Sequence, residues 1–308
     1  MTNKIIAIQG DHPKKLNPIS DTSIFLAYEA QNKKYLIFYY EPKNLSIIDN
    51  NVVAKGFFIK FNYTKKKFFR IIKYQKLNLL KCKFILIRQD PPFNLEYIST
   101  TYILDRINHK VKIINNPTSI RNISEKLYSA KYKKFMPDTM FTQNIVEIKK
   151  FFKLHKKVIL KPIHSFSGND IYLRNKFNLK FIKRFIKKHN HIVCQKYLSK
   201  ISKGDKRVFL INGKVVGVIS RIPKKGSFLS NMSKGAKPIN TKLTKIEKKI
   251  SDFVAKDLKK ENIFFAGIDF IDQKLNGDIN VTSPTGLKTF YDLSKVNLAK
   301  TFWKELKT

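Results

Sequence analysis

Two short runs of sequence decide the fold of this chain: GIDFI at residues 267–271 and DINV at residues 278–281. Both runs are apolar and rich in β-branched residues, and they flank the turn-forming residues KLNG at positions 274–277. Strand-forming runs that are separated by a short, glycine-containing polar segment usually pair with each other. The sequence therefore predicts a β-hairpin that turns at residues 274–277.

The predicted hairpin carries three oxygen-bearing side chains, those of Asp269, Asp278 and Asn280. Side chains alternate between the faces of a strand, so Asp278 and Asn280 share one face. If the register places Asp269 opposite Asn280, all three side chains converge on one face; a register shift of one residue would send Asp269 to the other face. Three hard oxygen ligands suit Mg²⁺, above all when phosphate and water complete its coordination. Taken alone, the Asp-Ile-Asn triplet is more often an ordinary half-exposed strand.

The composition is strongly basic, with 62 Lys and Arg against 22 Asp and Glu and a net charge of +40. Such a charge normally indicates a polyanionic partner such as nucleic acid. The lysines are spread along the chain, however, and Ile, Asn, Phe and Tyr, whose codons are rich in A and T, are also abundant. We interpret the charge as a compositional bias on solvated faces and expect no nucleic-acid partner. A basic nucleic-acid-binding protein is the alternative that the charge alone supports.

The two cysteines, Cys82 and Cys194, lie far apart in apolar, strand-like surroundings. They have neither metal-ligand spacing nor a redox motif, so we expect buried free thiols in a reducing compartment. The chain opens directly into a strand-like run without a secretory signal, and no apolar run is long enough to span a bilayer. These features predict a cytoplasmic globular protein without a membrane partner.

The first third of the chain alternates between strands and helices, which predicts an open parallel sheet. Ligands of such sheets bind beyond the carboxyl ends of the strands, where the loops at 10–13 and 88–92 fall. The helix after the first strand begins at a cap that contains Asp21. The expected strands are at residues 5–8, 35–40, 84–87 and 111–114, and a second helix is expected near residues 97–108.

The rest of the chain is predicted to form two smaller α/β units. Residues 122–125 match a capping box, which predicts a helix with Lys126 in its first turns. Lys161 follows an expected strand at 157–160, and the Asn212-Gly213 pair is the strongest hairpin signal in the chain. The other expected elements are helices at 145–155, 177–188, 244–260 and 299–306, a strand at 192–195, and a loop at 224–237.

Several segments together resemble bacterial glutathione synthetase, an ATP-grasp ligase, in the family's order and spacing. They are RQDPPF at 88–93, SEKL at 124–127, LKP at 160–162, GDKRV at 204–208 and NVTSPTG at 280–286. The resemblance implies an α/β ATP-grasp fold, with an N-terminal Rossmann-like domain that has a parallel sheet at 1–121. A two-part ATP-grasp domain would follow, with a lid subdomain at 122–196 and a C-terminal subdomain that carries the metal site at 197–308.

The resemblance also implies a reaction. ATP would phosphorylate the cysteinyl carboxylate of γ-glutamylcysteine, and the amine of glycine would displace phosphate from the acyl phosphate to give glutathione. The cofactors would be ATP and Mg²⁺, with Mn²⁺ as the alternative metal. The partners would be these small molecules and further copies of the chain, with a tetramer as one form. Two alternatives within the fold are a ligase with another acceptor amine and a decayed protein that binds nucleotide without turnover.

The resemblance assigns roles to individual residues. It implies metal ligands at Asp269, Asp278 and Asn280, and substrate contacts at Arg88, Asn280, Ser283 and Thr285. It implies nucleotide contacts at Lys126, Lys161, Gly168, Gln195, Lys196, Tyr197, Leu198 and Asp205. It implies catalytic cations at Arg207 and Arg221. Strict alternation from the Asn212-Gly213 turn would put Arg221 on the other face of the hairpin from Arg207, so the two can act together only if a bulge or the strand end intervenes.

The chain departs from the family pattern at three places. The lid loop at 164–170 reads HSFSGND and keeps a single glycine, so any other position that needs a positive φ would be strained. Leu229 stands where the family has an arginine, in a loop that has also lost glycines. Asp278 stands where the family has a glutamate, beside an apparent one-residue insertion. Because one misplaced group can cost about 10²-fold in rate, we expect an active but slow enzyme.

Overall fold

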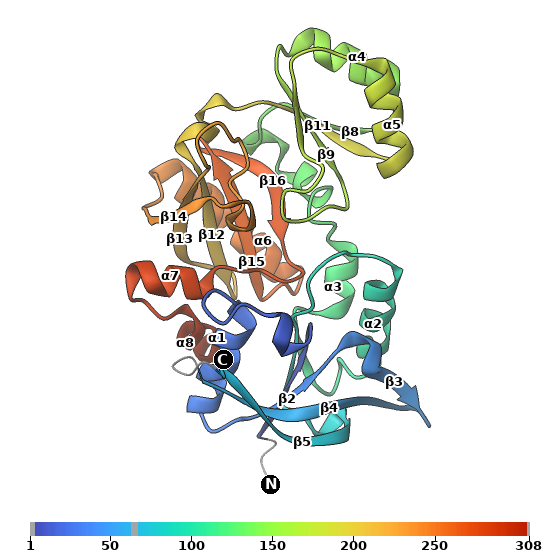
Figure 1. Ribbon diagram of the computed structural model, residues 1–308, viewed down its shortest axis with the longest axis vertical. Coiled ribbons are helices and arrows are strands. Elements are labelled where there is room, and N and C mark those ends of the chain that lie inside the picture. Colours follow the sequence, from blue (N-terminus) through green and yellow to red (C-terminus); the bar gives the residue numbers. More distant parts are fainter. Residues whose placement is uncertain (1–3, 63–66, 307–308) are drawn as a thin grey trace.

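The computed structural model describes residues 4–62 and 67–306, which form three sheets with helices packed against them (Figure 1). The N-terminal domain lies at one end of the molecule, the lid at the other, and the C-terminal sheet between them. None of the helices in the described residues combines the length and apolar character that a bilayer span requires.

The N-terminal sheet has the strand order β3-β4-β2-β1-β6-β7, with β5 paired to β4. Four of its strands are parallel neighbours, as predicted: β1 (Ile5–Gln9), β2 (Leu36–Tyr40), β6 (Phe84–Ile87) and β7 (Lys112–Ile114). The sequence analysis did not predict the antiparallel part, which consists of β3 (Leu45–Ile48), β4 (Asn51–Phe61) and β5 (Phe69–Asn78). The sheet is therefore mixed rather than wholly parallel.

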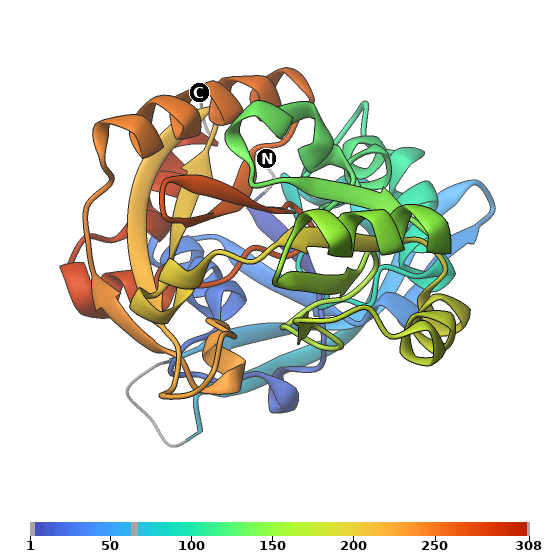
Figure 2. The same cartoon turned by 90° about the horizontal axis from the view of Figure 1, so that it is seen from above.

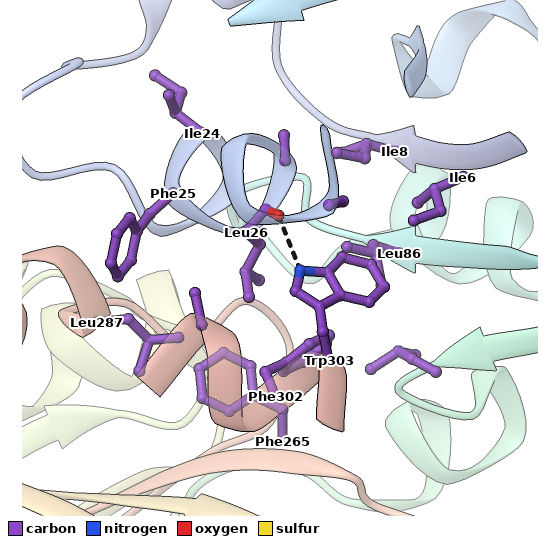
Figure 3. Close-up of a cluster of buried hydrophobic side chains, with 14 of the residues drawn as sticks. Ile6, Ile8, Ile24, Phe25, Leu26, Leu86, Phe265, Leu287, Phe302 and Trp303 are labelled. Atoms are coloured by element: carbon purple, nitrogen blue, oxygen red, sulfur yellow. Dashed lines mark hydrogen bonds between the residues drawn. The ribbon is translucent and has the colours of Figure 1, made fainter. Parts of the chain in front are cut away.

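Helix α1 (Thr22–Asn32) begins where the sequence predicted, because the Asp21 carboxylate accepts a hydrogen bond from the amide of Ile24. Its inner face packs against the two last helices, α7 (Leu287–Ser294) and α8 (Leu298–Glu305). Figure 3 shows the contact: the Trp303 indole is buried beneath α1 and donates a hydrogen bond of 2.9 Å to the carbonyl of Leu26. One hydrophobic core thus joins the two ends of the described chain.

The remaining helices of the N-terminal domain, α2 (Leu95–Asp105) and α3 (Pro117–Asn122), pack against each other. The predicted helix through Lys126 is wrong. The chain instead makes a turn at residues 125–127 and a 3-10 segment at Tyr128–Phe135 that is interrupted at Tyr132. A capping box would bring the Glu125 carboxylate back to the start of the helix, but this carboxylate accepts hydrogen bonds from Val281 and Thr282 instead.

The lid sheet is antiparallel, with the order β10-β9-β11-β8. Its strands are β8 (Thr139–Thr142), β9 (Val158–Pro162), β10 (Tyr172–Arg174) and β11 (Ile192–Lys196). Helices α4 (Ile145–Leu154) and α5 (Leu179–His189) cover its outer side (Figure 1). They bury Ile148 and Phe185 against the sheet residues Leu160 and Cys194.

Cys82 and Cys194 are buried free thiols, as predicted, and burial raises the pKa of each to about 12.

The C-terminal sheet is antiparallel, with the order β14-β13-β12-β15-β16. Its strands are β12 (Asp205–Ile211), β13 (Lys214–Ile222), β14 (Lys237–Asn240), β15 (Phe265–Ile271) and β16 (Lys274–Asn280). The Asn212-Gly213 turn has the predicted positive φ angles, whereas β14 was not predicted. Helix α6 (Lys245–Lys260) begins at a complete capping box of Thr244 and Glu247 and runs along the outside of the sheet (Figure 2).

Candidate active site

A cavity of about 610 Å³ lies between the N-terminal domain, the lid and the C-terminal sheet. Asp21 and Asp90 contribute from the N-terminal loops, Lys161 from the lid, and Arg207 from the C-terminal sheet. Every site residue that the sequence analysis named lines this cavity except Arg88. They are Lys126, Lys161, Gly168, Gln195, Lys196, Tyr197, Leu198, Asp205, Arg207, Arg221, Asp269, Asp278, Asn280, Ser283 and Thr285.

The β15–β16 hairpin brings Asp269, Asp278 and Asn280 to the cavity, but through a register different from the expected one. Its turn is the pair Asp272-Gln273, where both residues have positive φ, rather than residues 274–277, which lie within β16. Asn280 is opposite Gly267, and the pairing shifts between Ile268 and Phe270. Asp269 and Gly267 are two residues apart and share a face, so Asp269 still points to the side of Asn280.

Gly277 lies at this irregularity with a φ of 86°, a conformation that favours glycine. The predicted turn at residues 274–277 is therefore wrong, because its glycine belongs to the irregular part of the strand, and Asp269 does not pair with Asn280. The convergence of the three side chains on one cavity is nevertheless found. Asp278 and Asn280 are half-buried, whereas Asp269 is buried.

Asp269 is held by two arginines. Arg207 donates through Nε and Nη2 at 2.5 and 2.7 Å, and Nη2 of Arg221 lies 3.1 Å from the second oxygen. Burial alone would raise the pKa of Asp269, but the two guanidinium groups outweigh it and lower the pKa below the ordinary aspartate value. Asp269 is therefore an anion that already has two cationic partners.

A β-bulge puts Arg207 and Arg221 on the same face of the sheet. The register of β12 against β13 shifts between Phe209 and Leu210, so that Asp205 pairs with Arg221. This is the irregularity that the sequence analysis required for the two arginines to act together. Asp205 accepts hydrogen bonds of 2.8 and 2.5 Å from Arg221 and a further one from the hydroxyl of Ser230.

Two buried ammonium groups face Asp278. Nζ of Lys161 lies 3.7 Å from one carboxylate oxygen, and Nζ of Lys126 lies 3.9 Å from the other. Burial lowers the pKa of Lys161; Asp278 opposes this shift, and Lys126 adds to it. Lys161 also donates to the carbonyl of Asn276, and Lys126 donates to the carbonyl of Ser165. Two cations that share one carboxylate form a site that favours additional anionic oxygens.

The lid supplies a glycine and a strand end. Gly168 has a φ of 74°, and a Cβ there would lie 2.6 Å from the side-chain oxygen of Asn231. Two other lid-loop residues, Ser167 and Asp170, also have positive φ, at 56° and 55°, so the strain expected from the lost glycines falls on these two positions. Residues 195–198, at the end of β11, line the cavity with the side chain of Gln195 bonded to Thr139.

The predicted substrate residues differ in position. Ser283 and Thr285 line the cavity, and the Ser283 hydroxyl is a buried atom without a hydrogen-bond partner among the described residues. Arg88 is buried beneath the wall instead. Its Nε donates to Ser23 at 3.0 Å, while its Nη1 has no hydrogen-bond partner in the described chain. The structure does not bring Arg88 to the cavity surface, and its contact with substrate stays a prediction.

Sequence reasoning missed several residues of the site. Asn276 accepts from Lys161, Ser230 donates to Asp205, and Glu125 binds the chain that follows β16. Glu125 belongs to the SEKL segment, and its place next to Lys126 was a signal that could have identified it as a residue of the site. Asn276 and Ser230 lie in segments that were interpreted as a turn and a loop, where no pattern distinguished them.

Most of the chain corresponds to two known protein domains. Residues 5–121 match the N-terminal domain of prokaryotic glutathione synthetase, and residues 125–295 match the ATP-grasp domain of the same enzyme. The chain belongs to the prokaryotic glutathione synthetase family. Members of this family are ATP-dependent ligases that form glutathione, and this chain is such a ligase.

Relatives match over nearly the full length. The glutathione synthetase of Mesorhizobium japonicum is 34% identical over 303 residues, which cover 97% of this chain and 96% of that protein. That of Buchnera aphidicola subsp. Baizongia pistaciae is 36% identical over 282 residues, which cover 89% of this chain and 87% of that protein.

Two solved structures share the ATP-grasp fold. D-cycloserine synthetase DcsG has a TM-score of 0.65 at 10% identity, covering 98% of both chains. D-alanyl-alanine synthetase A from Vibrio cholerae has a TM-score of 0.62 at 13% identity, and the match covers 98% of this chain and 97% of that chain.

The ATP-grasp family uses ATP together with a divalent metal. One solved structure of the same fold, the ligase PsnB, contains Mg and ADP. It has a TM-score of 0.62 at 12% identity, and the match covers 99% of this chain and 97% of that chain. The donor set here fits such a metal, because Asp278 and Asn280 offer hard oxygens on one face of β16. The described residues contain no cluster of three His, Cys, Asp or Glu side chains that could hold a metal.

Proposed function

We propose that this ligase joins glycine to the cysteinyl carboxylate of γ-glutamylcysteine through an acyl phosphate, with ATP as the phosphoryl donor and Mg²⁺ as the metal. One observation carries the proposal: Lys126, Lys161, Asp278 and Asn280 line one cavity together with the substrate-side residues Ser283 and Thr285. Cations and hard oxygen ligands for a metal are the groups that phosphoryl transfer needs, and the Ser283 hydroxyl is left without a partner among the described residues.

The phosphate end of the cavity is assigned to Lys126 and Lys161, whose ammonium groups neutralise phosphate oxygens. Arg207 and Arg221 are fixed cations on the next strands, and Asp205 and Asp269 hold them in place before substrate binds. Such preorganised charges stabilise a transition state without reorganising during the reaction. The metal neutralises the phosphate groups when it is bound, with Asp278 and Asn280 as its ligands and Asp269 as a third. This all-oxygen set favours Mg²⁺ over softer metals.

The nucleotide base is assigned to the lid. Backbone groups of Gln195, Lys196, Tyr197 and Leu198 read the purine edge, and Gly168 lets the lid loop approach the phosphates. The lid loop also contacts the loop at 224–237, because Nζ of Lys234 donates to the side-chain oxygen of Asn169 at 2.8 Å. This contact between two loops favours the exclusion of water, which would otherwise hydrolyse the acyl phosphate.

The test is a single assay with ATP, Mg²⁺, γ-glutamylcysteine and glycine, in which phosphate release and tripeptide formation are both measured. We expect equal amounts of phosphate and glutathione, at a low rate because of Ser167 and Asp170 in the lid loop. Product with a different acceptor amine but not with glycine would identify a sibling ligase and overturn the proposal. ATP binding without any product would overturn it in favour of a protein that only binds nucleotide.

Two further properties complete the proposal. The enzyme is a cytoplasmic protein and a homo-oligomer, with a tetramer as the expected form. Light scattering of the purified enzyme at several concentrations gives its subunit number directly. A monomer at all concentrations would contradict the oligomer.

A further inference from the structure

Glu125 connects two parts of the site that are far apart in the sequence. One oxygen of its carboxylate accepts three hydrogen bonds, from the amide of Val281 at 2.9 Å and from the amide and hydroxyl of Thr282 at 3.1 and 2.8 Å. Its main-chain carbonyl accepts a fourth, from the amide of Ile279 at 2.9 Å. Residue 125 therefore fixes both the end of β16 and the chain that follows it.

These hydrogen bonds lie beside the part of the cavity that is proposed to bind the peptide substrate. Lys126, the next residue, faces Asp278, and residues 282–286 line the cavity. The first two residues after β16 are held by the Glu125 side chain, and Gly286 is held by the hydroxyl of Thr22. Ser283 and Thr285 lie between these two anchors.

An ionised carboxylate suits this position because three donors converge on one oxygen, and hydrogen bonds to an ionised acceptor are about twice as strong as neutral ones. Loss of the side chain would leave two backbone amides without these partners, so the loop would leave its present position. The carbonyl of residue 125 would remain bonded to Ile279, and β16 would remain paired with β15. Asp278 and Asn280 would then keep their place while residues 281–286 move.

We propose that Glu125 is a positioning residue for the peptide substrate: it holds the loop at residues 281–286 at a fixed place beside Lys126 and Asp278. The inference rests on the proposed function, which assigns Ser283 and Thr285 to the substrate carboxylate. It predicts that loss of the Glu125 side chain impairs the use of the peptide substrate but not the binding of ATP, because the nucleotide end of the cavity does not depend on this side chain.

The test compares Glu125→Ala and Glu125→Gln with Glu261→Ala, a matched control on the surface at the end of α6. For Glu125→Ala we expect kcat/KM for γ-glutamylcysteine to fall about 10²-fold, since misplacement by about 1 Å costs that much. The KM for ATP should stay close to that of the wild type. Glu125→Gln keeps an acceptor oxygen and should recover part of the loss, and Glu261→Ala should behave as the wild type.

A second variant, Thr282→Val, removes one of the three donors and guards against misfolding of the alanine variant. If both residues act through one contact, the double variant should lose less than the product of the two single losses. Equal losses for ATP and dipeptide, no recovery in Glu125→Gln, or wild-type kinetics in Glu125→Ala would overturn the inference. If the wild type makes no tripeptide, the proposed function fails first; calorimetric binding of γ-glutamylcysteine to the wild type and Glu125→Ala then decides the inference separately, and equal or absent binding overturns it.

Discussion

Asp278→Asn is the sharpest test of the site. The carboxylate lies 3.7 and 3.9 Å from the ammonium groups of Lys161 and Lys126. At an effective dielectric constant of ~20, each such contact corresponds to about 4 kcal/mol of attraction. An amide of the same shape keeps one oxygen but loses this attraction, so two cations would face each other with no anion between them. Of the two carboxylates among the proposed metal ligands, it also removes the one that no arginine holds among the described residues.

The expected result is a large kinetic effect without loss of the fold. Removal of one preorganised charge from an active site costs about 10²–10³-fold in kcat. We expect a loss of this size, together with a rise in the Mg²⁺ concentration that gives half-maximal turnover. Steady-state rates over a Mg²⁺ titration measure both quantities, and circular dichroism verifies the fold. The matched control is Asp272→Asn, at the turn of the same hairpin, where the carboxylate forms an ion pair with the exposed Lys200.

Two outcomes would refute this reasoning. Near-normal turnover of Asp278→Asn at limiting Mg²⁺ would remove Asp278 from the metal site. An equal loss in Asp272→Asn would show that the hairpin responds to any change of charge, and the argument from the cavity would fail.

Three further predictions test other parts of the site. Gly168→Ala should raise the KM for ATP about tenfold or more, because it adds a Cβ 2.6 Å from the side-chain oxygen of Asn231 at a residue with positive φ. The control Gly226→Ala has a similar φ but nothing within 4 Å, and it should leave the KM for ATP unchanged. Arg221→Ala leaves Asp205 buried without its main partner and should lower the free energy of unfolding, measured with urea, by about 3–5 kcal/mol; a change like that of a surface salt bridge would contradict the buried network. Burial lowers the pKa of Lys161, so its charge is present at low pH and is lost as pH rises through a pKa below 10.5; the KM for ATP should therefore rise on the alkaline side, and a profile unchanged in Lys161→Met would exclude Lys161 as the cause.

Local signals in the sequence predicted local structure well. The Asp21 cap and the start of α6 at Thr244 were predicted because each depends on residues within one turn of helix. The Asn212-Gly213 hairpin was predicted because both residues favour the positive φ angles of a two-residue turn. The parallel part of the N-terminal sheet followed from the alternation of strands and helices.

The failures come from contacts between distant residues and from glycines with more than one use. Glu125 was interpreted as part of a capping box, since nothing near it reveals partners that lie 156 and 157 residues away. Gly277 suggested a turn, but the turn falls at Asp272-Gln273 and the glycine serves an irregular pairing. A joint role for Arg207 and Arg221 required either a bulge or a strand end between them, and the structure has the bulge, between Phe209 and Leu210.

The bond between Trp303 and Leu26 also has a consequence for biosynthesis. The two residues are 277 positions apart, and a ribosome that adds roughly 5–20 residues per second needs about 14–55 s to produce the second after the first. During that interval the face of α1 that packs against α7 and α8 has no partner, because these two helices have not yet been made. The first domain of this ligase therefore reaches its final packing only when translation has nearly finished, and a nascent-chain chaperone would find its target on α1.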